Sequence, residues 1–107
     1  MSFPKRKKLY LTLLLFVKEG KEDTFLEYEE KALTILPRYN GELIYRLRPT
    51  VENYINEAAE KPYEIHLVAF ASEEDFVAFK ADDERNRYAY LFQESVREVI
   101  LIEGRRS

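Results

Sequence analysis

Three of the four segments that the sequence predicts as strands are apolar on both of their faces. These segments run from Leu9 to Val17, from Ile65 to Ala71 and from Val99 to Ile102. Side chains alternate between the two faces of a strand, so a sheet with helices on one side and water on the other should alternate apolar and polar residues. A chain of 107 residues with enough helix for one face needs another layer to cover the second. The simplest source of that layer is a second copy of the chain, so the pattern predicts a homodimer that associates through the sheet face.

The remaining segments give the order of the elements. Apolar residues at helical spacing predict a helix from Phe25 to Tyr39, which Pro37 should end or kink. Alternation predicts an edge strand from Glu42 to Arg48. A helix capped by Ser72 and a second helical segment capped by Asp82 follow the third strand.

The order is therefore β-α-β-β-α-β, which predicts an α+β, ferredoxin-like sandwich with an antiparallel sheet. The first and third strands lie in the middle of such a sheet, and here they are the most continuously apolar. We predict one domain over residues 1–107, with a basic N-terminal arm at 1–8 and a C-terminal tail at 105–107. Thr50 to Lys61 reads as a long hairpin loop.

Composition limits the partners and the compartment. With 17 basic and 20 acidic residues the net charge is −3, so we expect neither nucleic acid nor a membrane as a partner. The absence of cysteine excludes disulfides and thiolate sites and fits a reducing, cytoplasmic compartment. The basic residues Lys5 to Lys8 before an apolar run are similar to the start of a secretion signal, but no small-residue cleavage site follows them. A solvated arm is our interpretation of this segment.

Several short motifs together resemble one family. They are Lys18-Glu19-Gly20-Lys21-Glu22, Tyr39-Asn40-Gly41-Glu42-Leu43, Pro62-Tyr63-Glu64-Ile65-His66-Leu67-Val68-Ala69-Phe70, Ser72-Glu73-Glu74 and Asp82-Asp83-Glu84-Arg85. This combination resembles the small bacterial proteins of domain of unknown function 1330, in the dimeric α/β-barrel superfamily of antibiotic-biosynthesis monooxygenases and EthD-like proteins. The resemblance implies a ferredoxin-like protomer and a dimer in which two sheets face each other. It implies no reaction, because the family has no settled activity and a fold does not fix a function.

Strand alternation collects one set of polar side chains that could form a site. His66 shares a strand face with Glu64, and the edge strand places Arg46 beside Arg48. If they face the barrel, they form a polar island in an apolar cavity, as is typical of a small-molecule site. Arginine would hold a carboxylate or a phenolate there, and His66 would exchange protons near neutral pH. The candidate residues are Arg46, Arg48, Glu64, His66, Tyr10 and Thr12.

Each of these residues also has a structural interpretation. A lone histidine on a strand often serves only as a hydrogen-bonded structural residue. Arg46 and Arg48 also fit edge-strand charges that pair with Glu64 or Glu42 and discourage sheet extension. One histidine without cysteine argues against a zinc site, and the chain has no glycine-rich phosphate loop and no serine-nucleophile motif. We therefore predict no metal and no cofactor.

Three functions stay open on the sequence. The first is binding of a small aromatic or acidic metabolite by the dimer. The second, implied by the superfamily, is a cofactor-independent monooxygenase or isomerase with His66 as general base and an arginine that stabilises an anion. The third is a structural interaction module. An enclosed pocket lined by His66 would favour the first two, whereas exposure or burial in a tight core would favour the third.

Overall fold

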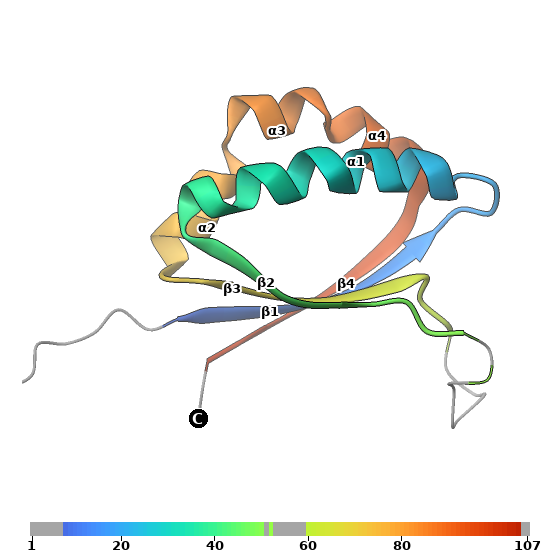
Figure 1. The fold of residues 1–107 in the computed structure, drawn as a ribbon, viewed down its shortest axis with the longest axis horizontal. Helices are drawn as coiled ribbons and strands as arrows, with labels where there is room; N and C mark the ends of the chain where they lie inside the picture. Colours follow the sequence, from blue (N-terminus) through green and yellow to red (C-terminus); the bar gives the residue numbers. More distant parts are fainter. Residues whose placement is uncertain (1–7, 51, 53–59, 106–107) are drawn as a thin grey trace, which may run out of the picture.

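A computed structural model describes residues 8–50, 52 and 60–105 of the chain. Its elements follow each other as β1 (Leu9–Val17), α1 (Glu22–Ile35), the 3-10 helix η1 (Leu36–Tyr39), β2 (Gly41–Leu47), β3 (Glu64–Phe70), α2 (Glu73–Lys80), α3 (Asp83–Arg87), α4 (Ala89–Ser95) and β4 (Val96–Gly104). The helices form one layer and the strands a second layer beneath it (Figure 1). Most of the predicted loop from Thr50 to Lys61 and almost all of the predicted basic arm lie outside the described residues.

The four strands form one sheet in the order β2-β3-β1-β4. Each neighbouring pair is antiparallel, and β1 and β3 occupy the centre. This arrangement confirms the predicted ferredoxin-like α+β fold. The last strand is longer than predicted, since β4 begins at Val96 directly after α4 and continues to Gly104.

The first helix begins three residues before the predicted segment, and its α-helical part ends four residues before the predicted end. Glu22 and Asp23 stand in its first turn, where acidic side chains favour the positive end of the helix dipole. The α-helix ends at Ile35, and the chain tightens into η1, which has Pro37 in its first turn. Asn40 then adopts a left-handed φ of 56°, which releases the chain into β2.

The two predicted helix caps are present. The Ser72 hydroxyl accepts a hydrogen bond from the Asp75 amide at 3.2 Å, so α2 begins after Ser72. The Asp82 carboxylate accepts the Arg85 amide at 2.8 Å in the same way at the start of α3. These caps set the position of the helices that cover one side of the sheet.

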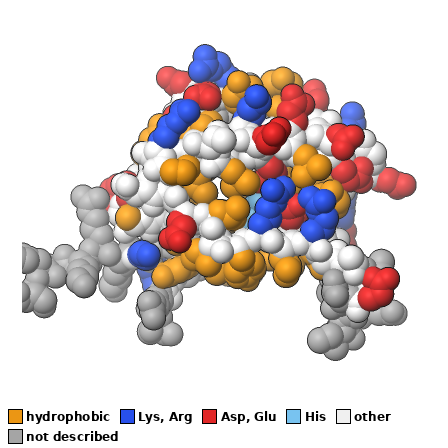
Figure 2. Space-filling view, viewed as in Figure 1, with side chains coloured by type: hydrophobic (Ala, Val, Ile, Leu, Met, Phe, Trp, Pro, Cys, Tyr) orange, Lys and Arg blue, Asp and Glu red, His pale blue; other side chains and the backbone are white. Residues whose placement is uncertain are grey.

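The two faces of the sheet have different surroundings. The helix-facing side chains of the central strands form the core, and they are Leu9, Leu11, Leu15, Val68 and Phe70. The opposite face carries apolar residues of all four strands, and none of the described helices covers it. These residues include Leu14, Tyr45, Leu47, Ile100 and Ile102. Figure 2 shows hydrophobic side chains along this lower side of the molecule. Tyr45, Leu47 and Ile102 are about half exposed, at 47%, 51% and 53%.

Candidate functional site

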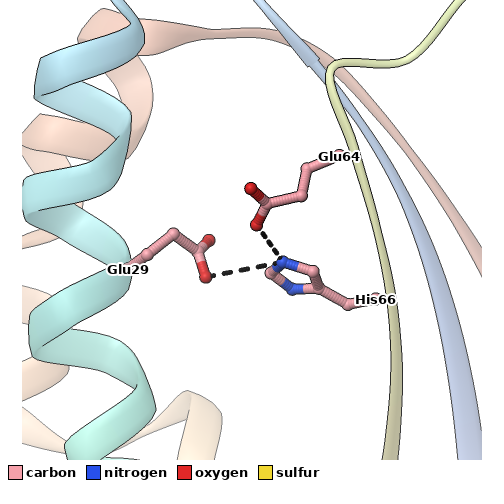
Figure 3. Close-up of side chains that lie close together, drawn as sticks. All are labelled: Glu29, Glu64 and His66. Atoms are coloured by element: carbon pink, nitrogen blue, oxygen red, sulfur yellow. Dashed lines mark hydrogen bonds and ion pairs between the residues drawn. The ribbon is translucent and has the colours of Figure 1, made fainter. Parts of the chain in front are cut away.

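His66 lies between two carboxylates in the space between β3 and α1. Its Nε2 is 2.5 Å from Oε1 of Glu64 and 3.7 Å from Oε2 of Glu29 (Figure 3). Glu64 precedes it by two residues on the same strand face, whereas Glu29 comes from the helix above. All three side chains are buried, with exposed fractions of 5% or less. The cluster therefore holds an imidazole and two carboxyl groups away from bulk water.

Two arginines, one on the edge strand β2 and one directly after it, keep Glu64 ionised. Arg46 Nε donates to Glu64 Oε1 at 2.5 Å, and Arg48 Nη2 donates to Oε2 at 2.7 Å. Burial favours the neutral acid, but the hydrogen bonds from His66, Arg46 and Arg48 outweigh it and hold the pKa of Glu64 at about 2. Glu64 is thus a fixed negative charge beside the imidazole at every physiological pH.

Glu29 has the opposite environment. Burial raises the pKa of Glu29 to about 7, although the nearby His66 works in the other direction. Its carboxyl group therefore changes charge near neutral pH, a property that catalytic acids and bases share. Glu29 is not among the site residues predicted from the sequence. The sequence does contain a signal for its burial. Glu29 lies at helical spacing from Phe25 and Ala32, which places it on the buried face of α1.

A cavity of about 220 Å³ lies between the sheet and the helix layer. Glu29 and His66 form part of its wall, and the rest is mostly aliphatic or aromatic. The lining residues are Leu11, Leu13, Leu15, Tyr28, Glu29, Ala32, Leu33, Leu36, His66, Val68, Phe70, Phe76, Phe79, Lys80, Arg85, Phe92, Val99 and Leu101. An apolar cavity with a few polar groups is the usual form of a small-molecule site.

The structure brings four of the predicted site residues together and separates the others. His66, Glu64, Arg46 and Arg48 form one hydrogen-bonded group. Tyr10 does not join it. In the register of β1 with β3, Leu13 pairs with His66 and Tyr10 pairs with Ala69, so Tyr10 lies on the opposite face of the sheet.

The same register corrects two further expectations. Thr12 pairs with Leu67 and therefore shares the outer face with Tyr10. The side of the sheet that carries His66 also carries Val68 and Phe70, and it faces the helices of its own chain rather than the interior of a barrel between two sheets. The candidate site is therefore contained within one protomer, and the outer face is separate from it.

The cluster also has the composition of a metal site. Glu29, Glu64 and His66 each offer one ligand atom, and these atoms lie within 4.8 Å of one another. Two carboxylates and an imidazole suit several divalent metals. However, both oxygens of Glu64 already accept hydrogen bonds from cationic arginines. An ion at this position would lie beside two guanidinium groups, so the residues fit a metal poorly.

No protein-family model matches this sequence, and no curated protein sequence matches it significantly. Solved structures with the same fold are numerous. A protein of unknown function from Rhodopseudomonas palustris superposes with a TM-score of 0.83 at 13% identity, over 96% of this chain and 85% of that one. Proteins of the NIPSNAP family from Agrobacterium tumefaciens also match.

Two further structures extend the comparison. A Bacteroides thetaiotaomicron protein of unknown function, described as a possible oxidoreductase, matches with a TM-score of 0.71 at 11% identity, over 94% of this chain and 99% of that one. A dabb family protein with a ferredoxin-like fold from Mesorhizobium loti matches with a TM-score of 0.68 at 12% identity, over 92% and 96%. These likenesses show a shared ferredoxin-like fold. Membership of the family of domain of unknown function 1330 stays a prediction.

Proposed function

We propose that this protein binds a small, mostly apolar molecule in the cavity under α1, and that Glu29 and His66 transfer a proton to and from it. The observation that carries the proposal is the position of an imidazole and a carboxyl group with a pKa near 7 in the wall of one apolar cavity. The sequence alone favoured a structural module if His66 was exposed or tightly packed. Its place in a cavity wall favours a binding site instead.

The size of the cavity limits its ligand. Cavities of about 150 Å³ lined by aliphatic and aromatic residues accept benzene, so 220 Å³ suits one aromatic ring with a short substituent. Rings of Phe76, Phe79 and Phe92 form part of the wall, and aromatic faces and edges pack well against another ring. We therefore infer a single-ring aromatic compound or an aliphatic compound of similar volume.

The hydrogen bonds of His66 define how it would move a proton. Ionised Glu64 only accepts hydrogen bonds, so Nε2 of His66 carries the proton that lies between them. In the neutral ring this leaves the lone pair on Nδ1, which can accept a proton from the ligand. The fixed charge of Glu64 stabilises the imidazolium that forms, and Glu29 can supply or remove a second proton at neutral pH. Such a cycle suits an isomerase, since it consumes no proton overall.

A cofactor-independent monooxygenase would begin with the same step. Oxygenation without a cofactor requires an activated aromatic anion, which His66 would produce by removing a proton. One structure of similar fold is described as a possible oxidoreductase, but its 11% identity extends only to the fold. Isomerisation requires nothing beyond the described side chains, and we therefore prefer it.

We also propose a homodimer that joins the two outer sheet faces. This face presents Leu14 among apolar neighbours, with Ile65 and Ile100 opposite it in the adjacent strands. Tyr45, Leu47 and Ile102 are about half exposed there. Soluble monomers seldom expose a contiguous apolar surface of this kind.

A thermal-shift screen tests the binding proposal. Single-ring phenols, ketones and acids should include compounds that raise the melting temperature, because a ligand of the folded state stabilises it. Leu33→Trp, which fills the cavity from α1, should abolish the shift. Leu26→Trp on the same helix is the matched control, since Leu26 does not line this cavity. Equal shifts in both variants would place the ligand elsewhere and contradict the proposal.

The proton-transfer role needs a second experiment with a compound from that screen. His66→Gln should keep the binding and lose the turnover of this compound, by about 10²-fold or more, as is usual for loss of a general base. A His66→Gln variant that binds and turns over the compound as well as the parent would leave only the binding proposal.

A further inference from the structure

Arg85 has an unused hydrogen-bond donor at the wall of the same cavity. Its side chain lines the cavity from α3, and its Nε is buried. Within the described residues this Nε has no hydrogen-bond partner. A buried donor without a partner is destabilising, so native proteins seldom keep one without a reason.

The contacts described for the Arg85 side chain are with neutral groups, which do not compensate its charge. The guanidinium group lies over the ring of Phe79, with its central carbon 4.9 Å from the ring centroid. Its Nη1 donates to the backbone oxygen of Lys80 at 3.3 Å, which is a long and neutral contact. Arg85 also interacts with the Tyr28 hydroxyl, whose pKa is raised by burial and lowered by Arg85. The nearby Asp82 carboxylate is shared between the Arg85 backbone amide and the Tyr39 hydroxyl.

We propose that Arg85 binds a carboxylate group of the ligand, so that the cavity takes a small aryl or alkyl carboxylate. The planar guanidinium fork matches a carboxylate in two parallel hydrogen bonds. A mostly apolar wall strengthens such a pair because it lowers the local dielectric. This inference rests on the proposed function and specifies the substrate class for the same cavity.

Arg85 and the proton-transfer pair belong to the same cavity. Arg85, Glu29 and His66 all line it, and its volume is about 220 Å³. A carboxylate at Arg85 and a reactive hydrogen near Glu29 can therefore belong to one molecule of single-ring size. Phenylacetate, which joins one aromatic ring to a carboxylate, is a probe of this size.

The sequence predicts a helix cap at Asp82 but no role for Arg85. The cap at Asp82 is present, but it also turns Arg85 toward the cavity side of α3, where its Nε is buried. The other cation of this wall, Lys80, lies over the ring of Phe76 at 4.3 Å. Lys80 therefore serves as the matched control for any general effect of positive charge at the cavity.

Calorimetric titration with phenylacetate and with its neutral isostere phenylacetamide tests the inference. We expect the parent protein to bind phenylacetate at least tenfold more tightly than the amide. Arg85→Gln should remove this preference while it leaves the affinity for phenylacetamide within about twofold. Arg85→Lys should restore part of the preference, and Lys80→Gln should keep it. Circular dichroism and the melting temperature verify that each variant is folded.

The contrary outcomes are distinct. Equal binding of the acid and the amide by the parent protein overturns the role of Arg85 but leaves the proposed cavity function standing. A preference for the acid that survives in Arg85→Gln and disappears in Lys80→Gln assigns the carboxylate to Lys80. This result also overturns the role of Arg85. Binding of neither compound at millimolar concentration contradicts the cavity function itself and this inference with it.

Discussion

Replacement of Glu29 by glutamine should make the protein more stable at pH 8 and remove part of its pH dependence. Glu29 is 5% exposed, and the pKa of its carboxyl group rises from 4.5 to about 7 on folding. This difference corresponds to about 3 kcal/mol, at ~1.4 kcal/mol for each pH unit. Glutamine has nearly the same shape and cannot ionise, so the variant never buries this charge.

The sign of the pH effect follows from the raised pKa. Between pH 4.5 and 7 the folded protein binds a proton at Glu29 that the unfolded chain has released. The stabilising contribution of Glu29 is therefore complete below pH 4.5 and is lost as the pH rises through about 7. The difference in unfolding free energy between Glu29→Gln and the parent should grow by about 3 kcal/mol in favour of the variant across this window.

Urea denaturation at fixed protein concentration, from pH 4.5 to 8, measures this difference. Glu30→Gln removes an exposed carboxylate from the same helix and serves as the control, with a stability curve parallel to that of the parent. A Glu29→Gln curve that also stays parallel to the parent curve would refute the reasoning, because Glu29 would then titrate alike in both states.

Three other perturbations have defined outcomes. Glu64→Gln leaves two arginines without their carboxylate and should lower the free energy of unfolding by about 3 kcal/mol at pH 7 in urea denaturation. The difference from the parent should shrink as the pH falls from 4.5 toward 2, because Glu64 of the parent then becomes protonated. A difference that stays constant over this range would contradict the lowered pKa of Glu64. Leu14→Asp puts a charge in the apolar outer face and should give a monomer of 12.8 kDa or an unfolded chain by light scattering, where the parent shows twice that mass. An unchanged dimer would mean that this face is not the interface. Addition of Mn²⁺ or Zn²⁺ should leave the melting temperature unchanged, whereas a saturable rise that Glu29→Gln abolishes would identify a metal site.

The sequence was sufficient for most of the fold because its signals are local. The apolar runs of β1 and β3, the alternation of β2 and the caps at Ser72 and Asp82 each depend on a few neighbouring residues. Elements and their order follow from such signals. The end of α1 was harder to predict from the sequence, because a 3-10 turn and an α-helical turn have almost the same side-chain spacing.

The site was only partly predictable because it depends on which face of the sheet the helices cover. Strand alternation correctly grouped His66 with Glu64, and the edge strand correctly supplied Arg46 and Arg48. Alternation alone does not show which residues of β1 share the sheet face of His66. Tyr10 was therefore assigned to the group, although Tyr10 lies on the other face. Glu29 comes from a helix, so no strand pattern could connect it with His66.

None of the described helices is long and apolar enough to cross a membrane. A cytoplasmic location stays a prediction.

The imidazole of His66 offers the most direct test of the central claim, since it is the only histidine of the chain and gives unique NMR signals. The signal to follow is its Hε1 proton during a titration with phenylacetamide, a neutral ring compound of suitable size. A ligand in the cavity beside His66 should shift this resonance saturably in the parent and not in Leu33→Trp. An Hε1 signal that stays unchanged while calorimetry reports binding would place the ligand outside the cavity and contradict the account.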